Sequence, residues 1–159
     1  MNVPKLTQVD PRWSWRTMFK KRLGQVGCLA TSITALAAAM TGKNLTPDML
    51  DRYIDEKPGG WDKSDNMPWA KACAWLSSEA VGWKVSKMTR SGWEVWRPTM
   101  PTNPHILEVR TSRNTQHFVV MVTWHSDKEA TVMDPGSSHG IYTTLSKERY
   151  TPVSVRVLA

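Results

Sequence analysis

Apolar residues follow a helical pattern in the first half of the chain and a strand pattern in the second half. Helix-forming residues fill positions 28–40, and Gly42 follows at the position where glycine commonly ends a helix. Thr46 and Pro47 place a capping hydroxyl before a proline, which is a strong helix start. Proline and glycine interrupt residues 1–27, which we expect to be irregular. The pattern predicts three helices, from about 28 to near 42, from about 46 to 56 and from about 65 to 80.

After Gly82 apolar residues alternate with polar ones, as they do in half-buried strands. The segment 117–124 shows the strongest alternation in the chain. Residues 91–103 and 134–140 are expected to be loops, because glycine and proline interrupt both segments. The predicted strands cover residues 83–88, 105–109, 117–124, 130–133, 141–145 and 153–158, enough for an antiparallel sheet of five or six strands.

Helices followed by strands indicate an α+β fold, with an N-terminal helical part packed on a C-terminal antiparallel sheet. The length of 159 residues favours one domain that is large enough to bury a core. Hydrophobic residues make up 40% and charged residues 22%, which is ordinary for a globular protein. We therefore expect a single domain, 1–159, with a helical half of about 1–80 and a β half of about 81–159.

The chain is basic, with 21 Lys and Arg against 14 Asp and Glu and a net charge of +7. This balance favours anionic partners such as a cell-wall polymer. The basic residues are spread along the chain, and the only local cluster is Arg16, Lys20, Lys21 and Arg22. No nucleic-acid-binding motif accompanies the cluster, so we expect no specific nucleic-acid partner.

No stretch contains the roughly 20 apolar residues that span a membrane, so membrane insertion is not expected. The first residues lack the apolar centre of a signal peptide. We therefore expect synthesis in the cytoplasm. Action on the cell envelope would then require release by lysis or delivery in a particle.

The two cysteines are too few for a disulfide framework. Cys28 opens the first predicted helix, where the positive end of the helix dipole favours the thiolate, which is the nucleophilic form. Cys73 lies in the third predicted helix and is expected to be a buried thiol.

His117 and Asp134 follow Cys28 in the second half of the chain. The order cysteine, histidine, carboxylate indicates a cysteine peptidase or related amide hydrolase. Cys28 would attack a carbonyl carbon and form a thioester, while His117 acts first as base and then as acid. Asp134 would orient the imidazole. Asp127 is the rival acid, but it lies in a turn that we expect at the far end of the hairpin.

Three further histidines raise the question of a metal site. The spacings of His105, His125 and His139 match no zinc motif. We expect neither a metal nor a cofactor.

Seven short motifs occur in order along nearly the whole chain. They are Val-Pro with Gln at 3–8, Asp-Pro-Arg-Trp at 10–13, Gly-Cys with Thr-Ser at 27–32, Leu-Thr-Pro at 45–47, Pro-His-Ile-Leu at 104–107, His-Phe-Val-Val at 117–120 and Asp-Pro-Gly at 134–136. Together they resemble the papain-like cysteine peptidases, and within them the double-glycine-leader (bacteriocin-processing) peptidases and their stand-alone relatives. The resemblance implies a papain-like fold, with an active cleft between the helices and the sheet.

The resemblance also implies that a glutamine completes the oxyanion hole with the backbone amide of Cys28. In the leader peptidases this glutamine lies close before the cysteine. Gln8 lies twenty residues before Cys28, so the chain between them would have to loop back. Gln25 lies only three residues before Cys28, which is awkwardly close. We prefer Gln8 and keep Gln25 as the second choice.

Gly27, Gly60, Trp61 and Gln116 are the further candidates for the substrate cleft.

A small, basic, stand-alone domain suits a bacterial or bacteriophage enzyme that cleaves peptidoglycan peptides, and equally suits a protease that processes a protein. The leader peptidases are usually fused to transporters, and this chain has no transporter, so a leader substrate is not expected. An amidase, deamidase or acyltransferase would share the triad. The alternative class is a catalytically inactive papain-like domain with a binding or structural role, such as a component of a phage particle.

Overall fold

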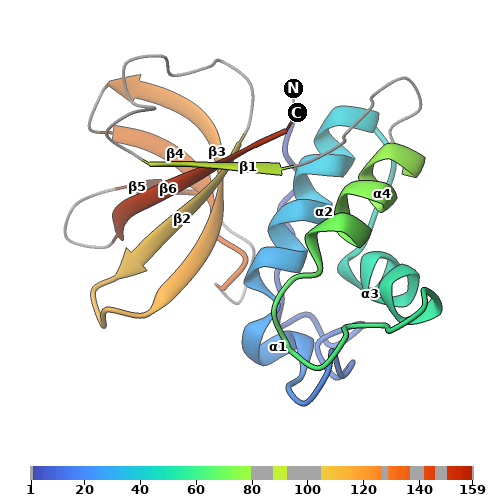
Figure 1. The fold of residues 1–159 in the computed structure, drawn as a ribbon. Helices are drawn as coiled ribbons and strands as arrows, with labels where there is room; N and C mark the ends of the chain where they lie inside the picture. The colour runs from blue at the N-terminus through green and yellow to red at the C-terminus, as the bar shows by residue number, and fades with distance from the viewer. Residues whose placement is uncertain are drawn as a thin grey trace.

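The computed structural model describes residues 2–79, 88–92, 105–126, 129–136, 142–145 and 150–158. The helices lie on one side of the molecule and the strands on the other (Figure 1). The helices are α1 (Leu23–Val26), α2 (Cys28–Thr41), α3 (Pro47–Glu56) and α4 (Trp69–Glu79). The strands are β1 (Met88–Gly92), β2 (His105–Thr111), β3 (Gln116–Ser126), β4 (Glu129–Met133), β5 (Tyr142–Leu145) and β6 (Tyr150–Leu158). The predicted α+β class is confirmed.

The six described strands form one antiparallel sheet in the order β1-β6-β2-β3-β4-β5. The last strand, β6, lies beside β2, and its first residue, Tyr150, pairs with Thr111. On the other side of β2, His117 of β3 pairs with Val109. Tyr150 and His117 therefore lie at the same end of the sheet. Asp134 directly follows β4, whose last residue pairs with Val120 of β3, so it reaches this end too.

Helix α2 is the central helix and lies between the sheet and the other long helices (Figure 1). All nine residues from 30 to 38 are buried, which requires apolar contacts on every side of the helix. The helix ends at Gly42, whose φ of 69° is the left-handed conformation that glycine adopts without strain. Thr46 caps α3, and Pro47 occupies its first position, as the sequence predicted.

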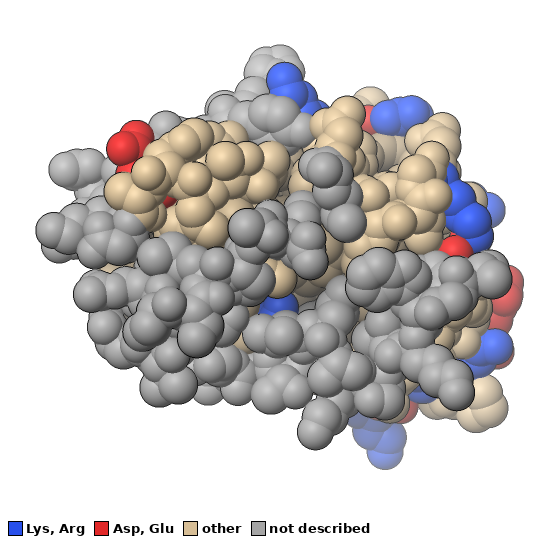
Figure 2. All heavy atoms as spheres, turned by 90° about the horizontal axis from the view of Figure 1, so that it is seen from above, with Lys and Arg blue, Asp and Glu red and all other residues tan. Residues whose placement is uncertain are grey.

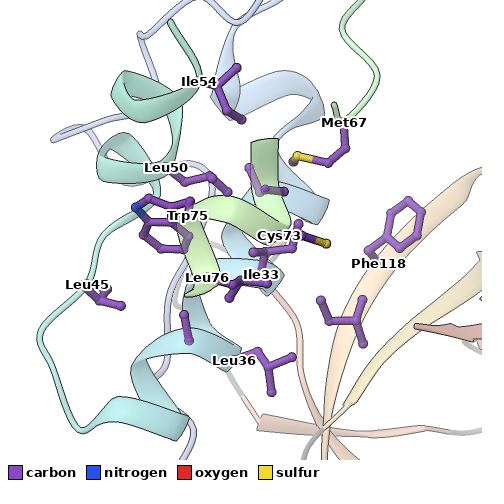
Figure 3. Close-up of a cluster of buried hydrophobic side chains, with 14 of the residues drawn as sticks. Ile33, Leu36, Leu45, Leu50, Ile54, Met67, Cys73, Trp75, Leu76 and Phe118 are labelled. Atoms are coloured by element: carbon purple, nitrogen blue, oxygen red, sulfur yellow. The ribbon is translucent and has the colours of Figure 1, made fainter. Parts of the chain in front are cut away.

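The helical core joins α2, α3 and α4 and extends to Phe118 on the sheet (Figure 3). Cys73 of α4 is buried in this core and forms no disulfide with Cys28, as expected. A smaller cluster places Val3, from the N-terminal segment, against Ala35 of α2 and Val120 of β3. The opposite face of the sheet buries a third cluster made by Leu107, Val109, Val119, Met121, Ala130, Val132, Tyr150 and Val155.

Four expectations about local structure require correction. The third predicted helix begins at Trp69, not near residue 65, because Pro68 disfavours a helical conformation at the residue before it. The N-terminal 27 residues are not wholly irregular, because 23–26 form the single turn α1. Ser91 and Gly92 belong to strand β1, not to a loop, because they pair with β6. Strand β6 begins at Tyr150, three residues before the predicted start, where pairing with β2 extends it. The predicted strand residues 83–87 and the turn residues 127–128 lie outside the described part of the chain.

Among the described residues, no helix is both long and apolar enough to cross a membrane. On the face shown in Figure 2, Lys and Arg side chains of described residues form no single patch: most lie apart from one another toward the right of the view, and one lies near the centre. Their dispersal on this face agrees with the even spread of basic residues along the sequence.

A buried carboxylate joins the N-terminal segment to α3. The side chain of Asp51 is fully buried and accepts a hydrogen bond from Arg16 Nε. Its Oδ1 atom also accepts a hydrogen bond of 2.9 Å from the indole nitrogen of Trp61. Removal of Asp51 leaves the indole N–H of Trp61 without this acceptor. It also leaves Arg16 with only its longer ion pair to the more exposed Asp55, at 3.6 Å.

We expect Asp51→Ala to lower the free energy of unfolding by about 3 kcal/mol, measured by urea denaturation. The matched control is Glu79→Ala, which removes an ion pair with Lys43 that is largely open to solvent. The control should lose less than about 1 kcal/mol. Equal losses in the two variants would contradict a structural role for the buried pair.

Candidate active site

A cleft of about 460 Å³ lies where the N-terminal end of α2 meets the first residues of β3. Its lining combines amide and charged side chains with apolar ones from the helical core. The lining includes Gln8, Gln25, Cys28, Gln116, His117 and Phe118. The structure therefore brings the predicted nucleophile, base and both candidate glutamines to one cleft.

Cys28 is the first residue of α2 and is half-buried in the cleft. The preceding Gly27 makes the turn between α1 and α2, and its amide donates to the Leu23 carbonyl over 2.7 Å. A Cβ atom on Gly27 would lie 2.3 Å from that carbonyl oxygen, so only glycine fits here. Gly27 is thus buried beneath the cysteine and does not line the cleft. The N-terminal end of α2, which carries the positive end of the helix dipole, therefore lies at the cleft.

His117 and Asp134 form a direct hydrogen bond. The distance between His117 Nε2 and Asp134 Oδ1 is 2.7 Å, and Asp134 is only 4% exposed. Because Nε2 faces Asp134, the other ring nitrogen, Nδ1, is the atom available to exchange a proton with Cys28. Cys28 and His117 line the same cleft, and the Cys28 side chain is one of the groups that raise the pKa of the imidazole. The structure thus brings the predicted nucleophile, base and carboxylate together.

Two further groups hold the Asp134 carboxylate. The amide of Gly136 donates to Oδ1 over 2.8 Å, and the hydroxyl of Tyr150 donates to Oδ2. The Tyr150 ring also stacks beside the His117 imidazole, with centroids 6.3 Å apart and planes at 22°. Sequence reasoning missed Tyr150, because it precedes the predicted last strand and belongs to no recognised motif.

The electrostatics of the pair favour the charged forms of both residues. Burial alone would lower the pKa of His117, but the hydrogen bond to Asp134 and the contact with Cys28 outweigh it and raise the pKa to about 9. Burial alone would raise the pKa of Asp134, but hydrogen bonds from His117 and Tyr150 outweigh it and lower the pKa to about 2. At neutral pH the pair is therefore an imidazolium beside a carboxylate.

The structure places the two candidate glutamines differently. Gln8 is 8% exposed, and its Nε2 donates to the Gly24 carbonyl over 3.1 Å, which leaves a second N–H on the same nitrogen. Its backbone amide donates to the Pro135 carbonyl over 2.9 Å, which places Gln8 beside the Asp134 loop. Gln25 is exposed, and its Oε1 accepts a hydrogen bond from the Arg22 amide. Gln8 is therefore the better-ordered donor at the cleft.

The structure places Gly60 and Trp61, which the sequence suggested for the substrate cleft, in other surroundings. Trp61 is 3% exposed and lies in the helical core, where Asp51 satisfies its indole nitrogen. Gly60 lies in the preceding turn, with a φ of 50°, and its carbonyl accepts a hydrogen bond from Lys71. Neither residue lines the cleft.

Gln116 does line the cleft, as expected. Its Nε2 donates to Glu108 Oε1 over 2.7 Å. Glu108 is itself buried and paired with Arg156 at 3.0 Å. The side-chain amide at the mouth of the cleft is therefore held by a buried ion pair in the sheet.

The structure offers no metal centre among the described residues, in which no three His, Cys, Asp or Glu side chains are grouped to hold an ion. His105 begins β2, and His125 lies near the end of β3 with Thr131 as its partner at 2.7 Å. His139 and the rival acid Asp127 lie outside the described residues.

Comparison of the sequence with protein-family models and with curated proteins finds no match.

Gly136 allows the Asp134 loop to approach the imidazole. A Cβ atom at position 136 would lie 2.9 Å from His117 Cε1 and 3.3 Å from Asp134 Oδ1. These distances are too short for an undisturbed ring, so any side chain here must displace His117 or the loop.

We expect Gly136→Ala to slow alkylation of Cys28 by iodoacetamide at pH 6 by about tenfold, because the displaced imidazole no longer stabilises the thiolate. The control is Gly42→Ala, which introduces strain at a left-handed position with no neighbouring atom within 4 Å. The control should lower the unfolding temperature but leave the alkylation rate unchanged. A rate in Gly136→Ala equal to that of the wild type would show that the ring tolerates the added methyl group.

Proposed function

We propose that the protein is a cysteine peptidase or related amide hydrolase with a papain-like arrangement of helices against an antiparallel sheet. One observation carries the proposal. A cysteine at the N-terminal end of a buried helix faces a histidine whose other ring nitrogen binds a buried carboxylate. This is the geometry that a nucleophile, a base and an orienting group require.

The reaction would begin with attack of the Cys28 thiolate on the carbonyl carbon of an amide. His117 would then donate its Nδ1 proton to the leaving amine, which leaves a thioester on Cys28. In the second half, neutral His117 would take a proton from water, and the hydroxide equivalent would hydrolyse the thioester. Asp134 would hold the Nε2–H throughout and stabilise the imidazolium in both steps.

Two N–H donors would stabilise the oxyanion of each tetrahedral intermediate. The backbone amide of Cys28 lies at the positive end of α2, where partial charges favour an anion. The N–H of Gln8 that is not used by Gly24 would supply the second donor. This assignment supports Gln8 over Gln25, because Gln25 is exposed and its amide oxygen already caps α1.

The substrate that we propose is a peptide amide, either in peptidoglycan or in a protein. The cleft offers both polar rim residues, such as Lys21 and Asp65, and an apolar floor that includes Met67 and Phe118. The net charge of +7 favours an anionic polymer as the substrate or its surroundings. The inactive binding domain is the alternative, and an intact cysteine–histidine–aspartate chain argues against it.

We expect wild-type Cys28 to react with iodoacetamide at pH 6 at least tenfold faster than Cys28 in His117→Ala. The reason is that His117 keeps its proton up to about pH 9, so an imidazolium is present in the cleft with Cys28 across the whole neutral range. A neighbouring cation makes a cysteine more reactive. Without the imidazolium, the cysteine should react as an ordinary thiol does, near pH 8.5. Mass spectrometry of the adduct distinguishes Cys28 from the buried Cys73.

The matched control is His125→Ala, because His125 also lies on β3 but binds Thr131 at its far end. Its alkylation profile should match that of the wild type. Slow alkylation in the wild type, with a midpoint near pH 8.5, would exclude the hydrolase and favour the binding domain. Fast alkylation should be followed by a screen of peptidoglycan and peptide libraries, with Cys28→Ser as the inactive reference.

With a substrate from that screen, we expect Gln8→Ala to lower kcat by about 100-fold, because one oxyanion donor is lost. Gln25→Ala, the matched control, should stay within about threefold of the wild type. Neither variant should change the alkylation rate of Cys28, since alkylation forms no oxyanion. The opposite order of the two kcat values would assign the oxyanion hole to Gln25.

A further inference from the structure

Tyr150 contacts both the base and the carboxylate of the proposed site. Its hydroxyl donates to Asp134 Oδ2, and its ring stacks beside His117. Tyr150 is 4% exposed and begins β6, the last strand of the chain. It reaches the site because β6 lies beside β2, on the opposite side from β3.

The carboxylate needs the donors that surround it. Asp134 is 4% exposed, and a buried carboxylate takes up a proton unless hydrogen bonds stabilise its charge. Oδ1 accepts from His117 Nε2 at 2.7 Å and from the Gly136 amide at 2.8 Å. The Tyr150 hydroxyl supplies a donor on the opposite oxygen, so the carboxylate is fixed against rotation about its Cβ–Cγ bond.

The orientation of the carboxylate in turn decides the orientation of the imidazole. His117 points Nδ1 toward Cys28 only while Nε2–H is held by Asp134 Oδ1. The stacked ring of Tyr150 limits rotation of the imidazole out of this plane. One side chain therefore restrains both members of the pair.

We propose that Tyr150 is a positioning residue of the active site, which holds Asp134 ionised and correctly oriented so that His117 can pair with Cys28. The inference rests on the proposed function. It gives a role in the reaction to β6, the last of the described strands. Simple packing is the competing explanation, because Tyr150 also belongs to the buried cluster on one face of the sheet.

The groups that act on this pair come from three elements and one loop. His117 from β3 and Tyr150 from β6 face Asp134, together with the backbone amide of Gly136. Asp134 and Cys28 of α2 face His117. Loss of the Tyr150 hydroxyl leaves Asp134 Oδ2 without this donor in a buried place, so Asp134 should take up a proton at higher pH.

The experiment is the rate of Cys28 alkylation by iodoacetamide between pH 3 and pH 8 in wild type and in Tyr150→Phe. We expect the acid limb, where the rate rises to its plateau, to move up by about one pH unit in Tyr150→Phe, a tenfold loss of rate at fixed pH on that limb. The matched control is Tyr53→Phe, which removes a hydroxyl from α3. Its profile should superimpose on that of the wild type.

A double-mutant cycle separates positioning from packing. Tyr150→Phe should have no further effect on the alkylation profile in an Asp134→Asn background, because the carboxylate through which it acts is gone. A loss of packing would affect the wild-type and the Asp134→Asn background equally. If Tyr150→Phe shifts the acid limb by the same amount in both backgrounds, the inference is overturned.

A second measurement covers the case in which Tyr150→Phe does not fold. Biosynthetic replacement of tyrosine by 3-fluorotyrosine keeps the ring shape and makes the hydroxyl a stronger donor. The acid limb should then move to lower pH, opposite to the shift in Tyr150→Phe. An unchanged limb would overturn the role of Tyr150 and leave the proposed function standing, whereas a wild-type profile like that of an ordinary thiol would remove the proposed function itself.

Discussion

The packing of α2 against β3 determines where Cys28, the proposed nucleophile, lies. Small side chains let the helix approach the strand so closely that Ser32 Oγ donates to the Phe118 carbonyl over 3.3 Å. One turn further along, Ala35 packs with Val120, so helix and strand run in the same direction. Four helical residues rise about 6 Å and two strand residues about 6.6 Å. One turn back from Ser32 therefore places Cys28 opposite the start of β3, where His117 lies.

The rest of the site depends on the ends of three strands, which lie at the same end of the sheet. His117 is the second residue of β3, β4 ends just before Asp134, and β6 begins with Tyr150. Each contributes one group to a continuous line of hydrogen bonds. A buried carboxylate is costly by itself, but donors from two strands and one loop amide offset that cost. The same hydrogen bonds give the Asp134 carboxylate a single orientation, so they account both for its negative charge and for the direction in which it points.

Local pattern predicted the long helices and most strands, because their periodicity and end signals agree with the tertiary contacts. Cys28, His117 and Asp134 could be found from residue type and order, since the chemistry limits the choice. Tyr150 could not, because the position of β6 beside β2 is a long-range pairing that periodicity does not encode. Trp61 misled for a related reason. Its residue type suggested a wall of the substrate cleft, but Asp51 satisfies its indole nitrogen and allows its burial in the helical core.

The position of Gln8 follows from hydrogen bonds between the N-terminal segment and the loop that carries Asp134. The Pro135 carbonyl accepts from the Gln8 amide at 2.9 Å and from Thr7 Oγ1 at 3.1 Å. Pro135 directly follows Asp134, so the proposed oxyanion glutamine and the carboxylate are attached to one short stretch of backbone. The burial of Val3 against α2 and the sheet anchors the same N-terminal segment from the other side. A glutamine twenty residues before the cysteine can thus serve the same cleft, because the loop that carries the acid also holds the glutamine in place.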